Sequence, residues 1–311
     1  MAEFSTRWSM DPIRNSEAIR LESISLGIEG SLVEAGSFTG FLKRSPPDNE
    51  VFGLTAAHCV PPALVGMPIC SPSTLEVTAR LKFLLPYTSL SKPEDCVAVT
   101  VGLEAEAKSL VRTFRFLPCL SGVTFSDPFD QFQEKTGVLY GGRLGTIVAR
   151  ELSSQNKLLF NYARGLWRLG LPTFYTKRSW HTTVDWCIFS CAQNRYGRNI
   201  YSEYPITETG YLYPHARVEK IGRSSGFHGG YVNRILLQHW GKGGLTHEIA
   251  ILGDDDIPFG INGDSGGCVL VDMRGIFKAA GILIAKNRCN DLALATPLHL
   301  VLDSARSYQW A

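Results

Sequence analysis

Residues 263–267 read Gly263-Asp264-Ser265-Gly266-Gly267, and this glycine-flanked serine decides how the rest of the chain is interpreted. Glycine tolerates backbone dihedrals that other residues avoid, so the sequence suits a tight turn that exposes the serine hydroxyl. In such a turn the N–H groups of Gly263 and Ser265 converge on one point and stabilise a developing oxyanion. Taken alone, the same five residues are also compatible with an ordinary glycine turn.

A second motif, Leu54-Thr55-Ala56-Ala57-His58-Cys59, precedes the serine. A serine hydroxyl is a poor nucleophile at neutral pH and needs a base, and histidine has the unperturbed pKa nearest to that task. Together and in this order the two motifs resemble the trypsin/chymotrypsin-like serine peptidases, whose motifs read T-A-A-H-C and G-D-S-G-G. The resemblance implies His58 as the base and Ser265 as the nucleophile.

Two aspartates compete for the third position of the triad, in which a buried acceptor orients the histidine. Asp185 and Asp95 both stand at the start of an apolar, strand-like run, as in the family's aspartate motif. Asp185 leaves room for one strand and a connector before the second barrel, whereas Asp95 would leave an unusually long connector. We therefore favour Asp185, and Asp95 remains the alternative.

Composition and charge narrow the function classes. The net charge is +2 with interspersed signs, so nothing favours nucleic acid or a membrane surface as a partner. The first 20 residues carry several charges and no apolar run, so a secretory signal is not expected there. Eight cysteines show no zinc-type C-x-x-C pair, and residues 1–58 contain no cysteine to pair with Cys59 as in secreted relatives. We expect buried thiols and a cytoplasmic protein.

The secondary-structure signals are mostly strand-like. Strands are expected at Leu75–Phe83, Cys96–Val101, Gly137–Val148, Phe277–Ile284 and Leu292–Ala295, and helices at Glu104–Phe114 and Pro297–Ala305. Many short strands with one closing helix are typical of the barrel and sandwich classes.

Residues 218–232 predict a hairpin, because two strand-like runs flank a glycine-rich turn. Their pattern V-x-K-x-G-R-x-[ST]-G-x-x-x-G-x-V resembles the opening of the second barrel in intracellular fungal or bacterial members of the family. The expected fold is all-β, with two six-stranded antiparallel barrels, a long insertion in the first and a short C-terminal helix. We assign residues 1–205 to the first barrel, with His58, Asp185 and an insertion at about 71–177, and 206–311 to the second, with Ser265.

The resemblance also bears on specificity. The pocket base that is aspartate in trypsins is Phe259 here, so a preference for Lys or Arg is not carried over. Gly281–Lys286 resembles the strand lining one pocket wall, so Ile284 and Lys286 are further pocket candidates. Lys286 either narrows the pocket or makes it positive, or it points to solvent, which we favour. Asp254–Asp256 is expected to be a solvated acidic turn.

We expect the protein to become active without proteolytic cleavage. Secreted trypsins pair a freed N-terminal amine with the aspartate before the serine, but no I-V-G-G sequence precedes His58. We expect Asp264 to find another partner, so that the intact chain can form its active site.

The sequence thus predicts a serine endopeptidase with a Ser-His-Asp triad, acting on a protein or peptide without metal or organic cofactor. It is expected to be regulated, with a regulatory protein partner as one option. The alternative is a catalytically inactive pseudo-protease that serves as a protein-binding scaffold.

Overall fold

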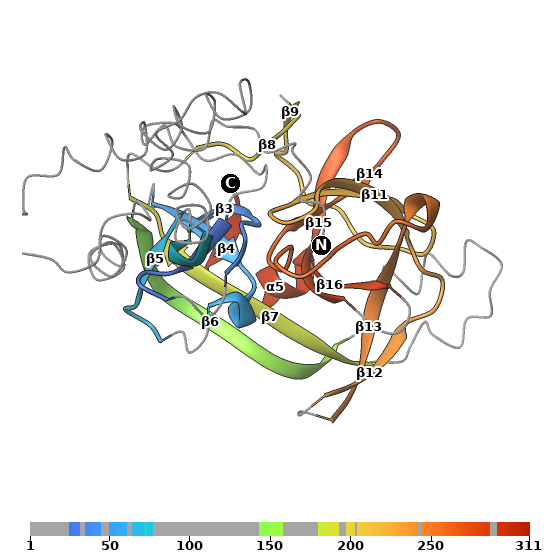
Figure 1. The fold of residues 1–311 in the computed structure, drawn as a ribbon, viewed down its shortest axis with the longest axis horizontal. Coiled ribbons are helices and arrows are strands. Elements are labelled where there is room, and N and C mark those ends of the chain that lie inside the picture. The colour runs from blue at the N-terminus through green and yellow to red at the C-terminus, as the bar shows by residue number, and fades with distance from the viewer. Residues whose placement is uncertain are drawn as a thin grey trace, which may run out of the picture.

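The structure is a computed structural model, and the two large antiparallel sheets in its described residues lie side by side (Figure 1). The residues that it describes are 25–31, 35–44, 50–60, 64–71, 73–76, 143–157, 180–192, 197–202, 204–241, 244–286 and 291–311. Asp95 and the elements expected at Cys96–Val101 and Glu104–Phe114 lie outside these ranges.

The first sheet has the strand order β17-β3-β4-β7-β6-β5-β1-β2. Only Phe38 and Thr39 separate β2 from β3, so the two form one bent strand whose ends pair with β1 and with β4. Counting them as one strand closes a six-membered ring. The bounds are β1 Ser25–Ile28, β2 Gly36–Ser37, β3 Gly40–Arg44, β4 Val51–Thr55, β5 Pro68–Cys70, β6 Arg143–Lys157 and β7 Trp180–Ser190.

The strand β6 lies within the range 71–177 that the sequence analysis assigned to an insertion, yet it belongs to the first barrel. It pairs with β5 on one side and with β7 on the other, over a long register that ends at Lys157 opposite Trp180. It overlaps the strand expected at Gly137–Val148. The strand expected at Leu75–Phe83 was wrong at its start, because residues 74–76 are helical. The rest of that expected strand, residues 77–83, lies outside the described residues.

The second sheet also closes into a ring of six strands. Its order is β11-β10-β14-β15-β16-β13-β12, and an additional pairing of β11 with β13 closes the ring and leaves β12 outside it. The bounds are β10 Arg217–Gly222, β11 Gly226–Val232, β12 Leu237–Gly241, β13 Gly244–Gly253, β14 Cys268–Asp272, β15 Phe277–Lys286 and β16 Ala293–Pro297.

The second barrel confirms several predictions. The hairpin expected at 218–232 is β10–β11, with Val218 opposite Gly230 and Gly222 opposite Gly226. The strands expected at Phe277–Ile284 and Leu292–Ala295 are β15 and β16. The helix expected at Pro297–Ala305 is α5, Leu298–Ser304, with Pro297 as its N-cap. Two closed six-stranded barrels and a short C-terminal helix confirm the predicted fold class.

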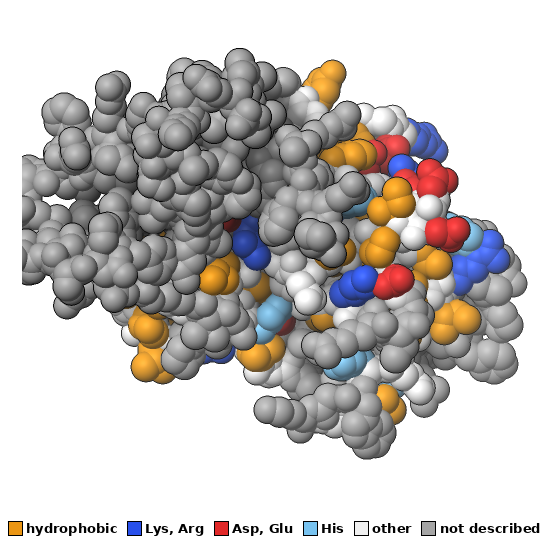
Figure 2. Space-filling model, viewed as in Figure 1, with side chains coloured by type: hydrophobic (Ala, Val, Ile, Leu, Met, Phe, Trp, Pro, Cys, Tyr) orange, Lys and Arg blue, Asp and Glu red, His pale blue; other side chains and the backbone are white. Residues whose placement is uncertain are grey.

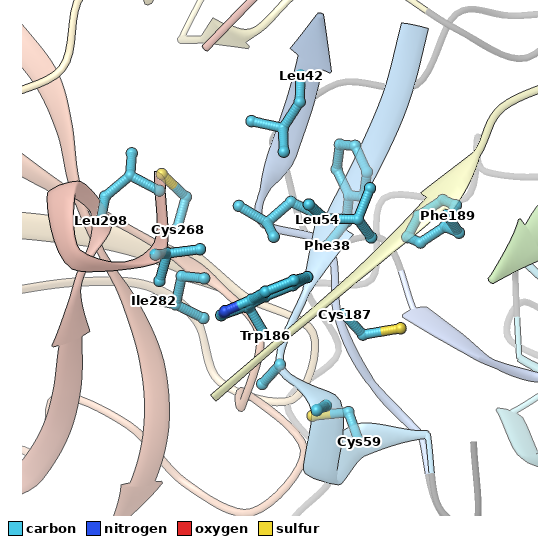
Figure 3. Packing of buried hydrophobic residues seen from close by; sticks show 14 of the residues in the cluster. Phe38, Leu42, Leu54, Cys59, Trp186, Cys187, Phe189, Cys268, Ile282 and Leu298 are labelled. Atoms are coloured by element: carbon cyan, nitrogen blue, oxygen red, sulfur yellow. The ribbon is translucent and has the colours of Figure 1, made fainter. Parts of the chain in front are cut away.

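A hydrophobic core runs between the barrels as well as inside the first one. Leu54 and Trp186 of the first barrel and Cys268, Ile282 and Leu298 of the second belong to one buried cluster (Figure 3). Burying apolar side chains across this boundary contributes about 25 cal/mol per Å² removed from water. The boundary is therefore part of the folded core, and groups placed there by the two barrels are held at fixed positions.

The last elements return the chain to the first barrel. The helix α5 contacts β7 of the first barrel and β15 and β16 of the second. The strand β17, Tyr308–Trp310, then pairs with β3, and Trp310 Nε1 donates to the Ile206 carbonyl at 2.7 Å. The two-stranded sheet of β8, Ile200–Tyr201, and β9, Tyr204–Pro205, lies in the connector between the barrels. None of the helices in the described residues has the length and apolarity to cross a membrane.

Candidate active site

The structure brings His58 and Asp185 into direct contact. His58 lies in the 3-10 turn η1, Ala57–Cys59, and Asp185 lies on β7. His58 Nδ1 is 2.5 Å from Asp185 Oδ2. The other carboxylate oxygen accepts the backbone N–H groups of Ala57 at 2.6 Å and His58 at 3.2 Å. The aspartate therefore fixes both the imidazole and the backbone that carries it.

The register of the first sheet explains this contact. The last residue of β4, Thr55, pairs with Cys187 of β7, two residues after Asp185. Side chains two residues apart point to the same face of a strand, so Asp185 extends past the end of β4 toward η1. Asp185 is 2% exposed, whereas the His58 side chain is 34% exposed. The Asp185 carboxylate is therefore shielded from solvent, whereas the His58 ring is partly exposed.

Three influences set the pKa of His58. Burial disfavours the charged imidazolium and so lowers the pKa of His58. The hydrogen bonds and charges of Asp185 and Cys59 raise it, and the net pKa lies above the ordinary 6.5. The Cys59 contact joins Sγ to His58 Nε2 at 3.7 Å. These contacts stabilise the protonated ring that forms when His58 accepts a proton.

The serine turn requires glycine at two positions. Gly263 and Gly266 have φ angles of 96° and 86°, in the left-handed region that side chains avoid. A Cβ on Gly266 would lie 2.3 Å from the Ser37 carbonyl oxygen, and one on Gly263 would lie 2.2 Å from Ser224 Oγ. The G-D-S-G-G sequence is therefore explained by backbone conformation and close packing.

Both barrels hold this turn. From the first barrel, Ser37 N donates to the Ser265 carbonyl at 2.7 Å, and Thr39 Oγ1 donates to the Gly266 carbonyl at 2.5 Å. From the second, Gly266 N donates to the Leu283 carbonyl at 2.7 Å. Gly36, next to Ser37, approaches both motifs, since a Cβ on it would lie 2.5 Å from Cys59 Sγ and 2.9 Å from the Ser265 carbonyl oxygen. Ser265 and the residue after His58 are thus neighbours across the barrel boundary.

The fold is chymotrypsin-like. Two closed antiparallel barrels meet along a shared core, the first carries the histidine and the aspartate, and the second supplies the serine turn at the boundary. The β2–β3 segment of the first barrel holds that turn through hydrogen bonds.

The serine hydroxyl itself has another partner in this structure. Ser265 Oγ donates to the Ile284 carbonyl at 3.3 Å. Among the described residues, no hydrogen bond joins Ser265 Oγ to His58. In apo enzymes, catalytic hydrogen bonds are often long and tighten only when substrate binds.

The amides expected to bind an oxyanion are available. In the part of the chain that the structure describes, the N–H groups of Gly263 and Ser265 donate to no acceptor. The Gly263 carbonyl, by contrast, accepts from Ser37 Oγ at 3.0 Å and from Arg223 Nε at 3.4 Å. These bonds fix the orientation of the peptide that follows Gly263.

Asp264, the residue before the serine, has an internal partner. Lys220 Nζ of β10 lies 2.7 Å from Asp264 Oδ2, and both side chains are fully buried. The carboxylate also accepts from Ser225 Oγ at 2.6 Å and Ile261 N at 3.0 Å on one oxygen, and from Ser224 N at 2.8 Å on the other. Burial raises the pKa of Asp264, but the charge of Lys220 and these bonds lower it below 3.8. The carboxylate is therefore ionised and fully satisfied.

Lys220 was missed as a site residue, although the quoted hairpin pattern contains it. The residues of β10 alternate between partly buried and buried, and Lys220 stands between Val218 and Gly222 on the buried face. A lysine at an inward position of an alternating strand indicates a buried acid, because an unpaired buried charge is costly. The sequence could not say that the acid is Asp264, 44 residues later.

The three pocket candidates lie in different environments. Phe259 is fully buried in the core of the second barrel, so its ring faces neighbouring apolar side chains. Ile284 is 8% exposed at the Ser265 hydroxyl. Lys286 Nζ forms a 2.6 Å ion pair with Asp291, and its side chain is 25% exposed. The charge of Lys286 is therefore paired.

The acidic sequence Asp254–Asp256 forms the 3-10 turn η3 with no buried residue. Asp254 is not simply solvated, because its Oδ1 lies 2.6 Å from Arg217 Nη1. Asp255 and Asp256 are exposed, as expected of a solvated turn.

Comparison with known proteins gives structural neighbours alone. No protein-family model matches the chain, and no curated protein matches it. Among solved structures, Thermobifida fusca protease A is 10% identical, with 94% of this chain and 98% of that chain covered and a TM-score of 0.46. A glutamic acid specific serine protease, described as using a novel histidine triad in substrate binding, is 11% identical with 94% and 100% covered and a TM-score of 0.47. Nocardiopsis protease is 10% identical, with 92% and 96% covered and a TM-score of 0.42.

Proposed function

We propose that this protein is a serine endopeptidase that hydrolyses peptide bonds in a protein or peptide substrate through His58, Asp185 and Ser265. The observation that carries the proposal is the contact of Asp185 with His58, close to a glycine-held serine turn. Asp185 stabilises the imidazolium and fixes which ring nitrogen is turned toward the reaction, as the third member of a triad does.

The proposed reaction divides the work among these groups. In its neutral form, His58 takes the proton of Ser265 Oγ on Nε2 as the hydroxyl attacks the substrate carbonyl, and the resulting imidazolium later gives that proton to the leaving amine. The amides of Gly263 and Ser265, which lack acceptors among the described residues, bind the oxyanion of the tetrahedral intermediate. Water then hydrolyses the acyl-enzyme on Ser265.

We propose that the approach of Ser265 Oγ to His58 begins with rotation of the serine side chain. The hydroxyl leaves the Ile284 carbonyl and turns to the ring when substrate arrives. Rotation about one side-chain bond is fast, so this step adds little to the barrier.

The edge of β15 offers a place for the substrate backbone. β14 pairs with β15 only as far as Cys268 opposite Ile282, while residues 283–286 pair with β16 on the other side. In the described residues, no strand pairs with the free side of Ala285 and Lys286. An extended peptide adds to such an edge through main-chain hydrogen bonds, which would bring its carbonyl to Ser265.

We further propose that the intact chain is competent and acts in a reducing compartment such as the cytoplasm. The Lys220–Asp264 pair supports the first point, because it gives the aspartate beside the serine an internal cation. The second is supported by five cysteines of the described residues, at positions 59, 70, 187, 191 and 268, that are not in disulfides with one another. A regulatory protein partner would act on this preformed site.

Covalent labelling with a fluorophosphonate tests the proposal without knowledge of the substrate. The intact, untrimmed protein should label at one serine, identified by mass spectrometry as Ser265, and Ser265→Ala should abolish labelling. Ser224→Ala is the matched control, because Ser224 Oγ lies near Gly263 but outside the proposed triad, and it should still label. Absence of labelling in the folded wild type would favour the pseudo-protease, whereas labelling that appears only after N-terminal trimming would contradict the internal role of Lys220.

A further inference from the structure

The imidazole of His58 has an acceptor on one side and a thiol on the other. Nδ1 is bound to Asp185, and Nε2, the nitrogen proposed to serve Ser265, lies 3.7 Å from Cys59 Sγ. Ser265 Oγ meanwhile donates to the Ile284 carbonyl. The ring nitrogen proposed to serve Ser265 is therefore already in contact with a second nucleophilic group.

Gly36 makes room for this thiol. A Cβ on Gly36 would lie 2.4 Å from Cys59 Cβ and 2.5 Å from Cys59 Sγ, so any larger residue would push the sulfur away. Residues 1–58 contain no cysteine, and Cys59 is not in a disulfide in the described structure. The sulfur thus keeps its thiol chemistry directly beside a catalytic base.

Cys187 shows how different the environment of Cys59 is. Both sulfurs lie in the same region of the core, Cys59 in η1 and Cys187 on β7 (Figure 3). Cys187 is fully buried, and burial raises its pKa to about 12, so it stays a thiol. A cationic ring beside a cysteine has the opposite effect and favours the thiolate, the reactive form.

We propose that Cys59 is an oxidation-sensitive thiol, activated by His58, whose conversion to sulfenic acid by a peroxide switches off the serine chemistry. The proposal rests on the proposed function for its effect on activity, but not for the thiol reactivity. It assigns to the catalytic centre a modification site for hydrogen peroxide or a similarly small hydroperoxide.

The step balances with the groups present and one peroxide molecule. The Cys59 thiolate attacks one peroxide oxygen, the O–O bond breaks, and the S–O bond of the sulfenic acid forms. The departing hydroxide takes the proton from the His58 imidazolium and leaves as water. Sulfur is oxidised by two electrons, peroxide is reduced, and a dithiol reductant reverses the change.

Access and consequence both follow from the position of the sulfur. Cys59 is 3% exposed, and the His58 side chain that it contacts is 34% exposed, so we expect a small oxidant to reach the sulfur more readily than a bulky one. The added oxygen lies next to His58 Nε2 and is a stronger hydrogen-bonding group than sulfur. It therefore competes with Ser265 Oγ for the ring nitrogen.

The experiment has two readouts, one of which does not need activity. Folded protein is treated with hydrogen peroxide; sulfenic acid is trapped with dimedone and located by mass spectrometry, and the fluorophosphonate labelling rate is compared before treatment, after it and after dithiothreitol. In the wild type we expect at least tenfold more dimedone on Cys59 than on Cys187, and at least a tenfold, reversible loss of labelling rate. In His58→Gln the Cys59 adduct should fall several-fold, because the cation that favours the thiolate is gone.

For each variant, the fluorophosphonate labelling rate after peroxide treatment is divided by the rate before it. This ratio should stay near one in Cys59→Ala and Cys59→Ser, and should fall in the matched control Cys187→Ala as in the wild type. Two results would overturn the proposal: no dimedone on Cys59 in the wild type, or a peroxide loss that persists in Cys59→Ser. A Cys59 adduct in a protein that never labels with fluorophosphonate would leave the thiol assignment standing and reject the proposed function.

Discussion

Among the described residues, each barrel carries one buried carboxylate that faces a basic side chain, and the two pairs differ in what surrounds them. Asp264 and Lys220 in the second barrel are both fully buried. In the first barrel only Asp185 is buried, and the His58 side chain remains one-third exposed. A fully buried ion pair fixes a conformation, whereas a partly exposed pair with a histidine ring can exchange protons with a substrate. On the face of the second barrel that Figure 2 shows, apolar side chains are interspersed with charged side chains of both signs.

The partly exposed His58–Asp185 pair should affect reactivity more than stability. We expect Asp185→Asn to lower the fluorophosphonate labelling rate by about 10⁴-fold, because the amide favours the wrong tautomer of His58. Its free energy of unfolding should fall by no more than about 1.5 kcal/mol, since the asparagine oxygen can still accept a backbone N–H. Labelling kinetics and urea denaturation measure the two effects.

Asp95→Asn is the control for this prediction and tests the alternative raised by the sequence. It should label like the wild type. A large loss in Asp95→Asn with little change in Asp185→Asn would transfer the proposed role from Asp185 to Asp95.

The fully buried Lys220–Asp264 pair should affect stability more than the His58–Asp185 pair does. Lys220→Met leaves the Asp264 carboxylate buried without its cation, and breaking a buried pair in this way costs about 3–5 kcal/mol. The matched control is Lys278→Met, because Lys278 pairs with the largely exposed Glu208, and such pairs are worth about 0–1 kcal/mol. Urea denaturation of both variants is the measurement, and equal losses would remove the contrast between the pairs.

The double variant Lys220→Met/Asp264→Asn sharpens the same point. Removing both buried charges avoids the uncompensated carboxylate, so at least half of the stability lost in Lys220→Met should return. The fluorophosphonate labelling rate should not return with it, because the turn before Ser265 loses its ionic anchor. Recovery of both properties together would show that the pair has no positioning role.

Acid should remove the contribution of Asp264. Its folded-state pKa lies below the ordinary 3.8, so the stabilisation is present above that value and is lost as pH falls through the folded-state pKa. The difference in unfolding free energy between wild type and Asp264→Asn should therefore be constant between about pH 7 and about pH 5 and shrink below about pH 4. A difference that grew in acid would mean that the carboxyl is held protonated.

The smallest expected effect concerns the His58–Asp185 pair. Cys59 is one of the groups that raise the pKa of His58, so Cys59→Ala should shift the acid limb of the labelling rate against pH to lower pH. The sign follows because a lower pKa leaves more neutral ring at any given pH. Cys187→Ala, which removes a thiol from the same core, should leave the limb in place.

The sequence predicted the parts of the site that local motifs encode. His58 and Ser265 come from short motifs, and glycines 263 and 266 are explained by the positive φ angles that such a turn needs. Asp185 came from an argument about connector length and lies on β7 in contact with His58. The strand signals alone indicated the barrel or sandwich classes, and the two closed barrels were expected from the family resemblance that the motifs carry.

What the sequence did not predict depends on contacts between distant residues. Lys220 finds Asp264 only because β10 pairs with β14, which follows the serine turn. The alternation at Leu75–Phe83 indicated a strand, yet residues 74–76 are helical, and periodicity alone does not report pairing partners. The distance between Cys59 and Gly36 likewise depends on how η1 folds against the bent β2–β3 strand.

The return of β17 to the first barrel makes the two barrels interlocked rather than merely adjacent. Asn199, in the connector, donates to the carbonyls of Phe41 and Ala311 and accepts from Phe41 N, and it thereby fastens the returning strand to β3. A single cut in the connector would therefore not release two independent halves, because one fragment would still supply an edge strand to the other. Two complementary fragments divided there would be expected to find each other and rebuild the boundary, because the N-terminal fragment alone would lack β17, the edge strand of its sheet.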